Sequence, residues 1–308
     1  QGRANCYNQS TPDFKQELAN FIDAFSLEMT VEGDAINTNG ENYAEQFANA
    51  AIDAQCSGAE VDFDNMVILD PSFLLNAKAI CVYNKLKTSN TLKNIFVNVF
   101  EATDRPFIIL KTGNLPGNAS GGTVGQCVPT NGNALLNTIT IDTDLIEDGH
   151  PLQISKTIAH EFIHAFLNIK LLNSNLGMTI PSLSNMEFYQ ALNTYSTAFA
   201  PLQNQHNFMY NYMLPTLQSI LSEVKDLFVD ELNNAEMLNL SMRIPFDTSP
   251  PSPFIWNEYY KNLALNGLQN CNFFQDEIGT FDINGNPIAV DQTKMQSYNQ
   301  YNQRGHEN

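Results

Sequence analysis

The residues with the clearest chemical potential are His160, Glu161 and His164, which form the pattern H-E-x-x-H within Thr157–Phe166. In a helix with about 3.6 residues per turn, side chains four positions apart lie one above the other on the same face. Two imidazoles placed in this way can bind one Zn²⁺. The Glu161 carboxylate would then lie beside the metal, where it can take a proton from a bound water molecule. The pattern therefore predicts a zinc centre at His160 and His164, with Glu161 as the general base.

A catalytic zinc site needs a third protein ligand and an open position for water. The longer pattern H-E-x-x-H-x-x-G-x-x-H is absent, because residues 167–170 contain neither the required glycine nor the third histidine. We favour His206, which is the only histidine between the motif and the C-terminal segment and begins a candidate helix. Glu187 and Glu223 are the alternatives, and either would give a site with two histidines and one carboxylate.

A tyrosine near the metal could donate a hydrogen bond to the oxyanion that forms during peptide cleavage. Tyr195, Tyr210 and Tyr212 are the candidates in this part of the chain. Tyr210 follows His206 by about one helical turn and would therefore share its face. We expect Tyr210 to be the second catalytic residue beside Glu161.

The motif needs a helix that packs on a sheet, and the flanking sequence predicts one. Alternating polar and apolar residues over 137–142 predict a half-buried strand, and residues 107–110 predict a shorter one. Residues 112–133 are rich in Gly, Asn, Pro and Ser, which is typical of a long surface loop. The back of the motif helix carries apolar residues at helical spacing, namely Ile154, Ile158, Phe162, Phe166 and Ile169.

The order of these segments predicts three parts. Residues 1–66 form an N-terminal helical segment, which ends in a polar and acidic stretch. Residues 67–280 hold the motif and form the catalytic domain. Residues 281–308 are rich in Gln, Asn and Tyr and poor in aliphatic side chains, so we expect a polar C-terminal tail.

Composition excludes several classes of partner. The chain has 33 acidic and 15 basic residues and a formal charge of −18, a balance that repels phosphate backbones, so we expect no nucleic-acid partner. No apolar run approaches the ~20 residues that span a bilayer, so we expect no transmembrane segment. The five cysteines form no C-x-x-C pair, which leaves one or two disulfides possible and excludes a zinc ribbon. Abundant Asn and scarce Lys lead us to expect an extracytoplasmic protein, secreted or at the cell surface.

The residues Thr157–Ala165 resemble the active-site helix of zincin metallopeptidases. The pattern Gln205-His206-x-x-Met209 and the segment Leu263–Leu268 are similar to features of secreted bacterial proteins of the SprT-like group. The resemblance implies an α+β, zincin-like fold: a small mixed sheet, an active-site helix and a mostly helical C-terminal part. It also implies that the strand before the motif helix forms the rim of a substrate cleft. The basic surface and cysteine zinc ribbon of nucleic-acid-associated members are missing here, so a DNA-linked role is not carried over.

Together these features predict a zinc-dependent endopeptidase that acts on a peptide or protein substrate. We expect the extended substrate to pair with the strand at 137–142 through main-chain hydrogen bonds. The alternative is a secreted or surface protein with a binding or structural role that keeps a degenerate zincin fold without turnover. The intact Glu161 favours the enzyme, because a purely structural zinc would not need that carboxylate.

Overall fold

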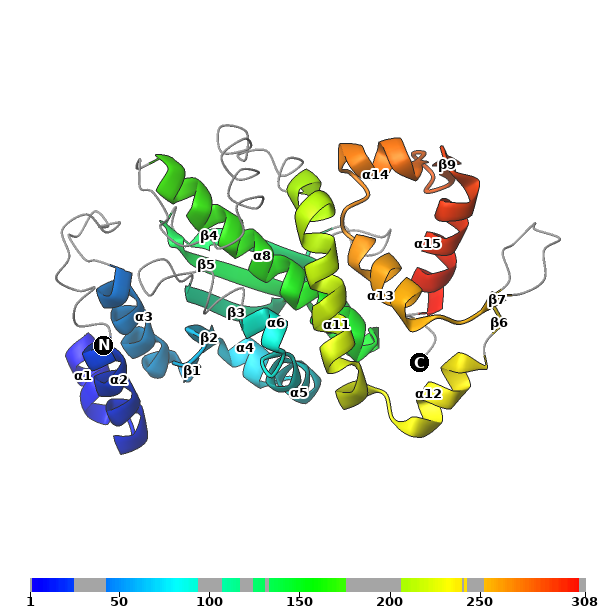
Figure 1. Cartoon of the computed structure of the whole chain (residues 1–308). Helices are drawn as coiled ribbons and strands as arrows, with labels where there is room; N and C mark the ends of the chain where they lie inside the picture. Colours follow the sequence, from blue (N-terminus) through cyan, green and yellow to red (C-terminus); the bar gives the residue numbers. More distant parts are fainter. Residues whose placement is uncertain are drawn as a thin grey trace.

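The computed structural model describes residues 2–24, 43–93, 107–116, 124–130, 133–175, 206–239, 241–242 and 252–304. Within these ranges the chain is a mixed α+β protein in which helices cover a small mixed sheet (Figure 1). This confirms the coarse fold class expected from the sequence. The elements after the motif helix are mostly helical, as expected.

The central sheet has five strands in the order β1-β2-β3-β5-β4. The inner strands β2, β3 and β5 run parallel, whereas β1 and β4 are antiparallel to their neighbours and form the two edges. Parallel strands have both faces covered, and β2 is accordingly buried along its whole length. The strands expected at 107–110 and 137–142 are confirmed as parts of β3 and β5. The five strands are β1 (Glu60–Asp62), β2 (Val67–Leu69), β3 (Phe107–Gly113), β4 (Gly125–Thr130) and β5 (Asn133–Asp142).

The edge strand β4 corrects two expectations. It lies inside the segment 112–133, which we expected to be a loop, and pairs with β5 from Gly125 opposite Ile141 onward. Gly and Pro are tolerated in an edge strand, so composition conceals it. The strand β5 lies between β3 and β4, so both of its edges are already paired. The expected pairing of a substrate with residues 137–142 is therefore wrong, and β4 rather than β5 forms this edge of the sheet.

The motif helix α8 (Pro151–Asn175) follows β5 through the short helix α7 (Thr143–Asp148). Asp142, at the end of β5, caps α7 by accepting a hydrogen bond from the amide of Asp144. Helix α8 lies along β4 and β5 and is crossed by α11 (Leu214–Phe228) (Figure 1). On its expected apolar face Ile154, Ile158 and Phe162 are buried, whereas the side chains of Phe166 and Ile169 fall outside the described part.

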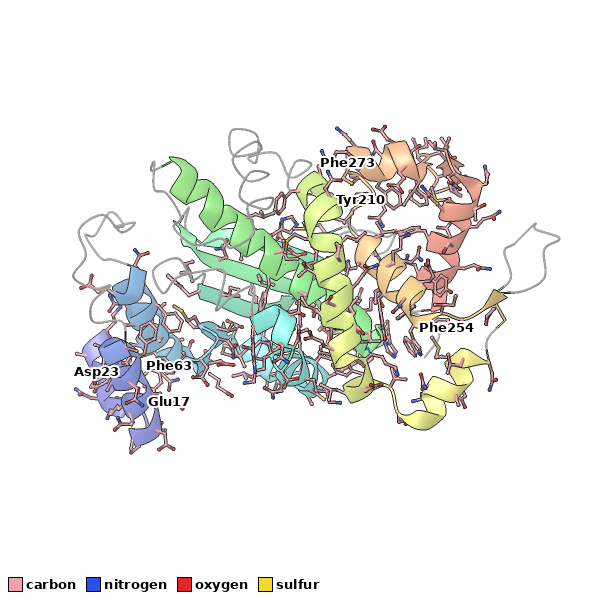
Figure 2. The ribbon with its side chains drawn as sticks, viewed as in Figure 1. Glu17, Asp23, Phe63, Tyr210, Phe254 and Phe273 are labelled. Atoms are coloured by element: carbon pink, nitrogen blue, oxygen red, sulfur yellow. A yellow bond between two sulfur atoms is a disulfide. The ribbon has the colours of Figure 1, made fainter. Side chains whose placement is uncertain are left out.

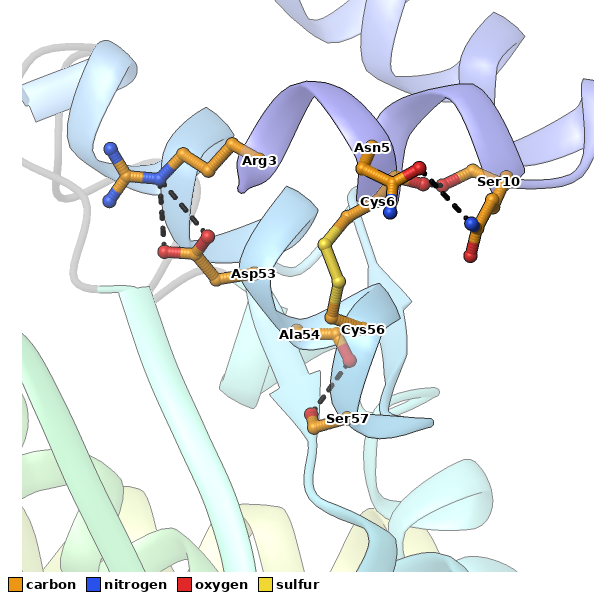
Figure 3. The surroundings of a disulfide bond; sticks show 9 residues. Arg3, Asn5, Cys6, Ser10, Asp53, Ala54, Cys56 and Ser57 are labelled. Atoms are coloured by element: carbon orange, nitrogen blue, oxygen red, sulfur yellow. Dashed lines mark hydrogen bonds and ion pairs between the residues drawn. A yellow bond between two sulfur atoms is a disulfide. The ribbon is translucent and has the colours of Figure 1, made fainter. Parts of the chain in front are cut away.

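The N-terminal helices share the core of the sheet. The disulfide Cys6–Cys56 and the ion pair between Arg3 and Asp53 join the first helix to the third (Figure 3). The boundary expected between residues 66 and 67 falls inside the β1–β2 hairpin. The helices are α1 (Arg3–Gln9), α2 (Pro12–Ala24) and α3 (Tyr43–Ser57). Aromatic rings from both sides of that boundary pack together, namely Phe14, Phe21, Phe47, Phe63 and Phe107.

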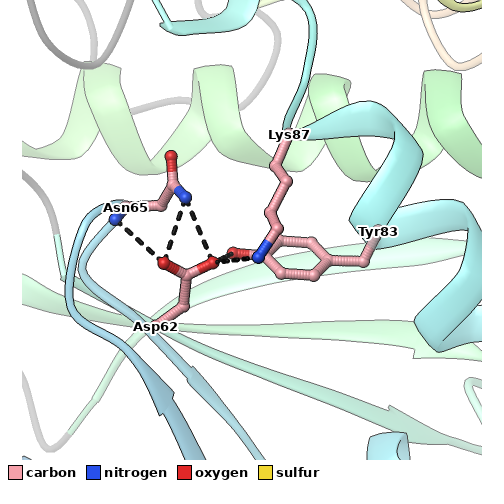
Figure 4. A network of polar contacts seen from close by, with 4 residues as sticks. All are labelled: Asp62, Asn65, Tyr83 and Lys87. Atoms are coloured by element: carbon pink, nitrogen blue, oxygen red, sulfur yellow. Dashed lines mark hydrogen bonds and ion pairs between the residues drawn. The ribbon is translucent and has the colours of Figure 1, made fainter.

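A polar network ties the edge strand β1 to the helices that follow β2. The Asp62 carboxylate accepts hydrogen bonds from Asn65, Tyr83 and Lys87 (Figure 4). Burial raises the pKa of Asp62, but the hydrogen bonds from Lys87 and Asn65 outweigh burial, so the net pKa is lowered. The helices in this region are α4 (Pro71–Leu74), α5 (Ala77–Leu86) and α6 (Asn90–Lys93).

The C-terminal part packs against α11. The expected polar tail after residue 280 is instead folded into β9 and α15, whose Met295, Tyr298 and Tyr301 are buried. These three side chains recur at helical spacing, so a stripe of one methionine and two tyrosines replaces the aliphatic stripe that usually signals a packed helix. The elements are α12 (Glu231–Leu238), β6 (Ser241–Met242), β7 (Ser252–Pro253), α13 (Trp256–Leu265), α14 (Asn272–Glu277), β8 (Gly279–Phe281), β9 (Pro287–Ala289) and α15 (Gln292–Arg304).

Candidate metal centre

Three buried histidines meet where α8 is crossed by the chain that leads into α11. One possible ligand atom from each of His160, His164 and His206 lies within 4.8 Å of the others. Their ring centroids are 4.9 to 5.5 Å apart. His160 and His164 lie four residues apart on α8, as the motif requires, and His206 comes from a separate helix. The structure thus brings together the three metal ligands expected from the sequence, and this group could hold a metal ion.

The geometry of the group fits a metal ion bound by imidazoles. The Nε2 atoms of His160 and His164 are 3.2 Å apart. Two ligands of a tetrahedral Zn²⁺ with Zn–N bonds near 2.05 Å are about 3.3 Å apart. In addition, Nδ1 of His206 is buried without a hydrogen-bond partner among the described residues. Such orphaned polar atoms are rare and mark places where an ion or a water molecule completes the set.

Burial keeps these histidines in the form that binds metals. Burial lowers the pKa of His160 well below its usual 6.5, and the neighbouring Lys156, His164 and His206 add to this. Burial also lowers the pKa of His206 to about 4, with Lys156 again contributing. At neutral pH both imidazoles are therefore uncharged and offer a lone pair, which is the state that a metal ion requires.

His206 is held in place by the wide helical turn that follows it. Residues 206–208 are helical and continue into a π-helical segment, Met209–Met213, and then into α11. Phe208 and Met209 are fully buried, which fixes this segment in the core. The Asn207 Oδ1 atom accepts a hydrogen bond of 2.8 Å from the amide of Asn272 at the start of α14. The third ligand is thus positioned by elements from the C-terminal part.

Of the two carboxylate alternatives for the third ligand, Glu223 is engaged elsewhere in the described structure. Glu223 on α11 accepts hydrogen bonds from the Ser89 hydroxyl at 2.7 Å and from the amide of Thr91 at 3.0 Å. These contacts hold the loop that leads into α6. Glu187 lies outside the described residues.

Glu161 is buried between α8 and the edge strand β4. Burial raises the pKa of Glu161 to about 8, although the charge of Lys156 and a hydrogen bond from the main chain of Cys127 act in the opposite direction. The approach of β4 is so close that a Cβ atom at Gly125 would lie 2.8 Å from the Glu161 Oε1 atom and 2.6 Å from Thr157 Cγ2. Only glycine fits at this position. A metal ion beside Glu161 would favour its charged form and lower this pKa.

Lys156 is a residue of the site that the sequence analysis missed. It is buried on α8 one turn before His160, and its charge acts on His160, Glu161 and His206. Burial lowers the pKa of Lys156 to about 8, while Glu161 opposes this shift. The spacing of Lys156, His160 and His164, each four residues from the next, is the sequence signal that could have found it.

The hydrogen bond and the ring stacking of Tyr210 are with α14 rather than with the three histidines. Its hydroxyl donates a hydrogen bond of 2.7 Å to Glu277 of α14, and its ring stacks on Phe273 (Figure 2). The π-helical segment begins at Met209, so the α-helical spacing that would put Tyr210 on the face of His206 does not apply. A catalytic role for Tyr210 stays a prediction. Tyr195 and the side chain of Tyr212 lie outside the described part.

Among the described residues, no helix has the length and apolar character needed to cross a membrane. No protein-family model, no curated protein and no solved structure matches this chain.

Proposed function

We propose that this protein is a zinc-dependent peptidase with a zincin-like active site. The observation that carries the proposal is a buried carboxylic acid, Glu161, next to a group of three buried imidazoles. Three histidine ligands and an adjacent acid are the set that a catalytic zinc site uses, whereas structural zinc sites have four protein ligands. Cu, Ni or Fe would also accept imidazoles, but zinc agrees with the H-E-x-x-H spacing.

The residues have distinct roles in the proposed reaction. His160, His164 and His206 would hold the zinc, which supplies Lewis acidity and brings the pKa of a water molecule towards ~7. The Glu161 carboxylate would accept a proton from the attacking water molecule and pass it to the nitrogen of the leaving amine. The edge strand β4 lies directly against Glu161, so an extended peptide that adds to its outer edge would pass over this carboxylate.

We also propose an extracytoplasmic location. The disulfide Cys6–Cys56 supports it, because such bonds persist in oxidising compartments and are rare in the cytosol. The formal charge of −18 agrees with a peptide or protein substrate rather than a nucleic acid.

Metal analysis and a peptidase assay test the proposed function. We expect one zinc per chain and cleavage of unstructured peptides. Glu161→Gln should keep the zinc and lower kcat/KM by about 10²–10⁴-fold, because it removes only the proton acceptor. Glu236→Gln, an exposed position on α12, is the matched control and should retain full activity. Purified protein that binds no zinc would sink the proposal, and bound zinc without turnover would favour a non-catalytic binding or structural protein.

A further inference from the structure

Lys156 is a buried cation that neither gives nor takes a proton in the proposed reaction. Its side chain is only 3% exposed. It makes no hydrogen bond or ion pair with any residue in the described ranges, and Glu161 acts on it only through its electrostatic field. Other lysines of the described chain, such as Lys87 and Lys294, pair with a carboxylate. Buried charges are normally paired, so the position of Lys156 calls for an anion.

The Lys156 ammonium group faces the metal centre. A Cβ atom built on Gly267 would lie 3.4 Å from both Lys156 Nζ and His160 Cε1, and 3.7 Å from His160 Nε2. The ammonium group and the ligand imidazole therefore both lie against the same side of Gly267. The backbone of Gly267 has φ of +95°, a conformation that glycine adopts without strain.

The turn at Gly267 is braced by the C-terminal part. The amide of Gly267 donates to Gln269 Oε1 at 2.9 Å, and Asn266 Nδ2 donates to Asn302 of α15 at 3.3 Å. Helix α15 thus holds the turn that faces Lys156 and His160. An anion bound here would meet a fixed surface rather than a loose loop.

The net charge of the chain limits which anions could bind next to Lys156. The chain carries a formal charge of −18, so its field repels ligands with several negative charges. One buried ammonium group matches one negative charge. A peptide supplies a single negative charge either at its terminal carboxylate or at an Asp or Glu side chain.

We propose that Lys156 binds a carboxylate of the peptide substrate beside the metal centre, so that peptides with a negative charge next to the cleaved bond are selected. This inference rests on the proposed peptidase function. The terminal carboxylate and an acidic side chain share the same chemistry, and the experiment below separates them.

The first measurement is binding to the metal-free, full-length protein, followed by NMR titration. The probes are N-acetylphenylalanine and its uncharged amide. We expect the acid to bind more tightly than the amide, and Lys156→Met to weaken binding of the acid by about 10-fold or more. Lys156→Arg should retain much of the binding. Lys93→Met, which removes an exposed lysine on α6, is the charge-matched control and should bind like the wild type. Equal binding of acid and amide, or unchanged binding of the acid by Lys156→Met, would overturn the proposal.

The second measurement is cleavage by the zinc-loaded protein of three matched peptides: a free acid, its C-terminal amide, and the same amide with an added Asp. Preference for the free acid assigns the terminal carboxylate, and preference for the Asp peptide assigns a side chain. Lys156→Met should abolish either preference. An equal loss on all three peptides would refute carboxylate selection. If no peptide is cleaved although zinc is bound, the peptidase function fails, while the binding measurement still decides on Lys156.

Discussion

Burial sets the protonation states of single side chains at the metal centre. Burial keeps His160 and His206 unprotonated and favours the neutral form of Glu161 until an ion is near. The pKa values of His206 and Glu161 are about 4 and about 8, whereas the same groups in water titrate near 6.5 and 4.5. The folded chain thus has lone pairs and an acid ready before any metal arrives. Lys156 adds a positive charge on the side of the metal centre that faces Gly267.

The third ligand gives the sharpest test at this scale. His206→Ala should lower zinc affinity by more than the ~10–100-fold that loss of a ligand-orienting group costs, because it removes a direct ligand. Glu223→Ala should keep the affinity of the wild type, because Glu223 is engaged by Ser89 and Thr91. Competition with a zinc-specific chelator measures both. Loss of zinc from Glu223→Ala with His206→Ala unaffected would move the third ligand to a carboxylate.

At the scale of elements, the site depends on two contacts of α8. The edge strand β4 covers Glu161 on one side, and the chain from His206 to α11 crosses on another. Neither contact is local in sequence. Both contacts depend on the sheet beneath α8 keeping its shape. At the far edge of this sheet, hydrogen bonds to Asp62 join β1 to α5.

Asp62→Asn tests that network. The lowered pKa of Asp62 means that its carboxylate contributes stability above the unfolded pKa of about 4 and loses it as the pH falls through the folded value. At pH 7 the variant should lower the free energy of unfolding by about 1–2 kcal/mol. Near pH 2 wild type and variant should be equally stable. Urea unfolding at both pH values measures this. Asp226→Asn is the control, because its pair with Lys225 has an 82% exposed carboxylate and should contribute little. A deficit that is the same at pH 2 would contradict the ionic origin.

At the scale of the whole molecule, one continuous core runs from the N-terminal helices to α15. The N-terminal and C-terminal helices lie at opposite ends of the sheet (Figure 1). The aromatic ring of Phe254 packs against Tyr301 of α15. The N-terminal end has the added constraint of the disulfide, which joins α1 to α3 but no element that carries a histidine ligand.

Removal of the disulfide should therefore affect stability and spare the metal centre. The Cys6→Ser/Cys56→Ser double variant should unfold with a free energy lower by about 2–4 kcal/mol, because the bond closes a loop of 50 residues in the unfolded chain. Its zinc content should match that of the wild type. Cys81→Ser, at an exposed free cysteine, is the control. Denaturant unfolding and metal analysis of the three proteins decide this, and loss of zinc from the double variant would show that the N-terminal end does support the site.

Local patterns predicted the parts of the site that have local causes. The spacing of His160 and His164, the alternation in β5 and the apolar back of α8 are all periodic, so they can be read from the sequence. The edge strand β4 and the helix α15 could not, because pairing with β5 and aromatic packing on α13 stabilise them rather than their own composition. Lys156 was missed for a related reason. Its burial depends on the turn at Gly267, which lies 111 residues further along the chain.

The π-helical segment Met209–Met213 lets the chain hold one extra residue between His206 and α11 without turning the imidazole away from the other two. A π-turn holds one residue more than an α-turn, and α11 beyond it is anchored in the core by Leu217, Ile220 and Leu221. Loss of one residue between His206 and Leu214 would therefore restore regular α-helix and leave His206 on nearly the same side of the helix axis. Loss of a second residue would rotate His206 by about 100° around that axis. In a related sequence, a gap of one residue at this point is compatible with an intact third ligand, whereas a gap of two would mark a chain that has given it up.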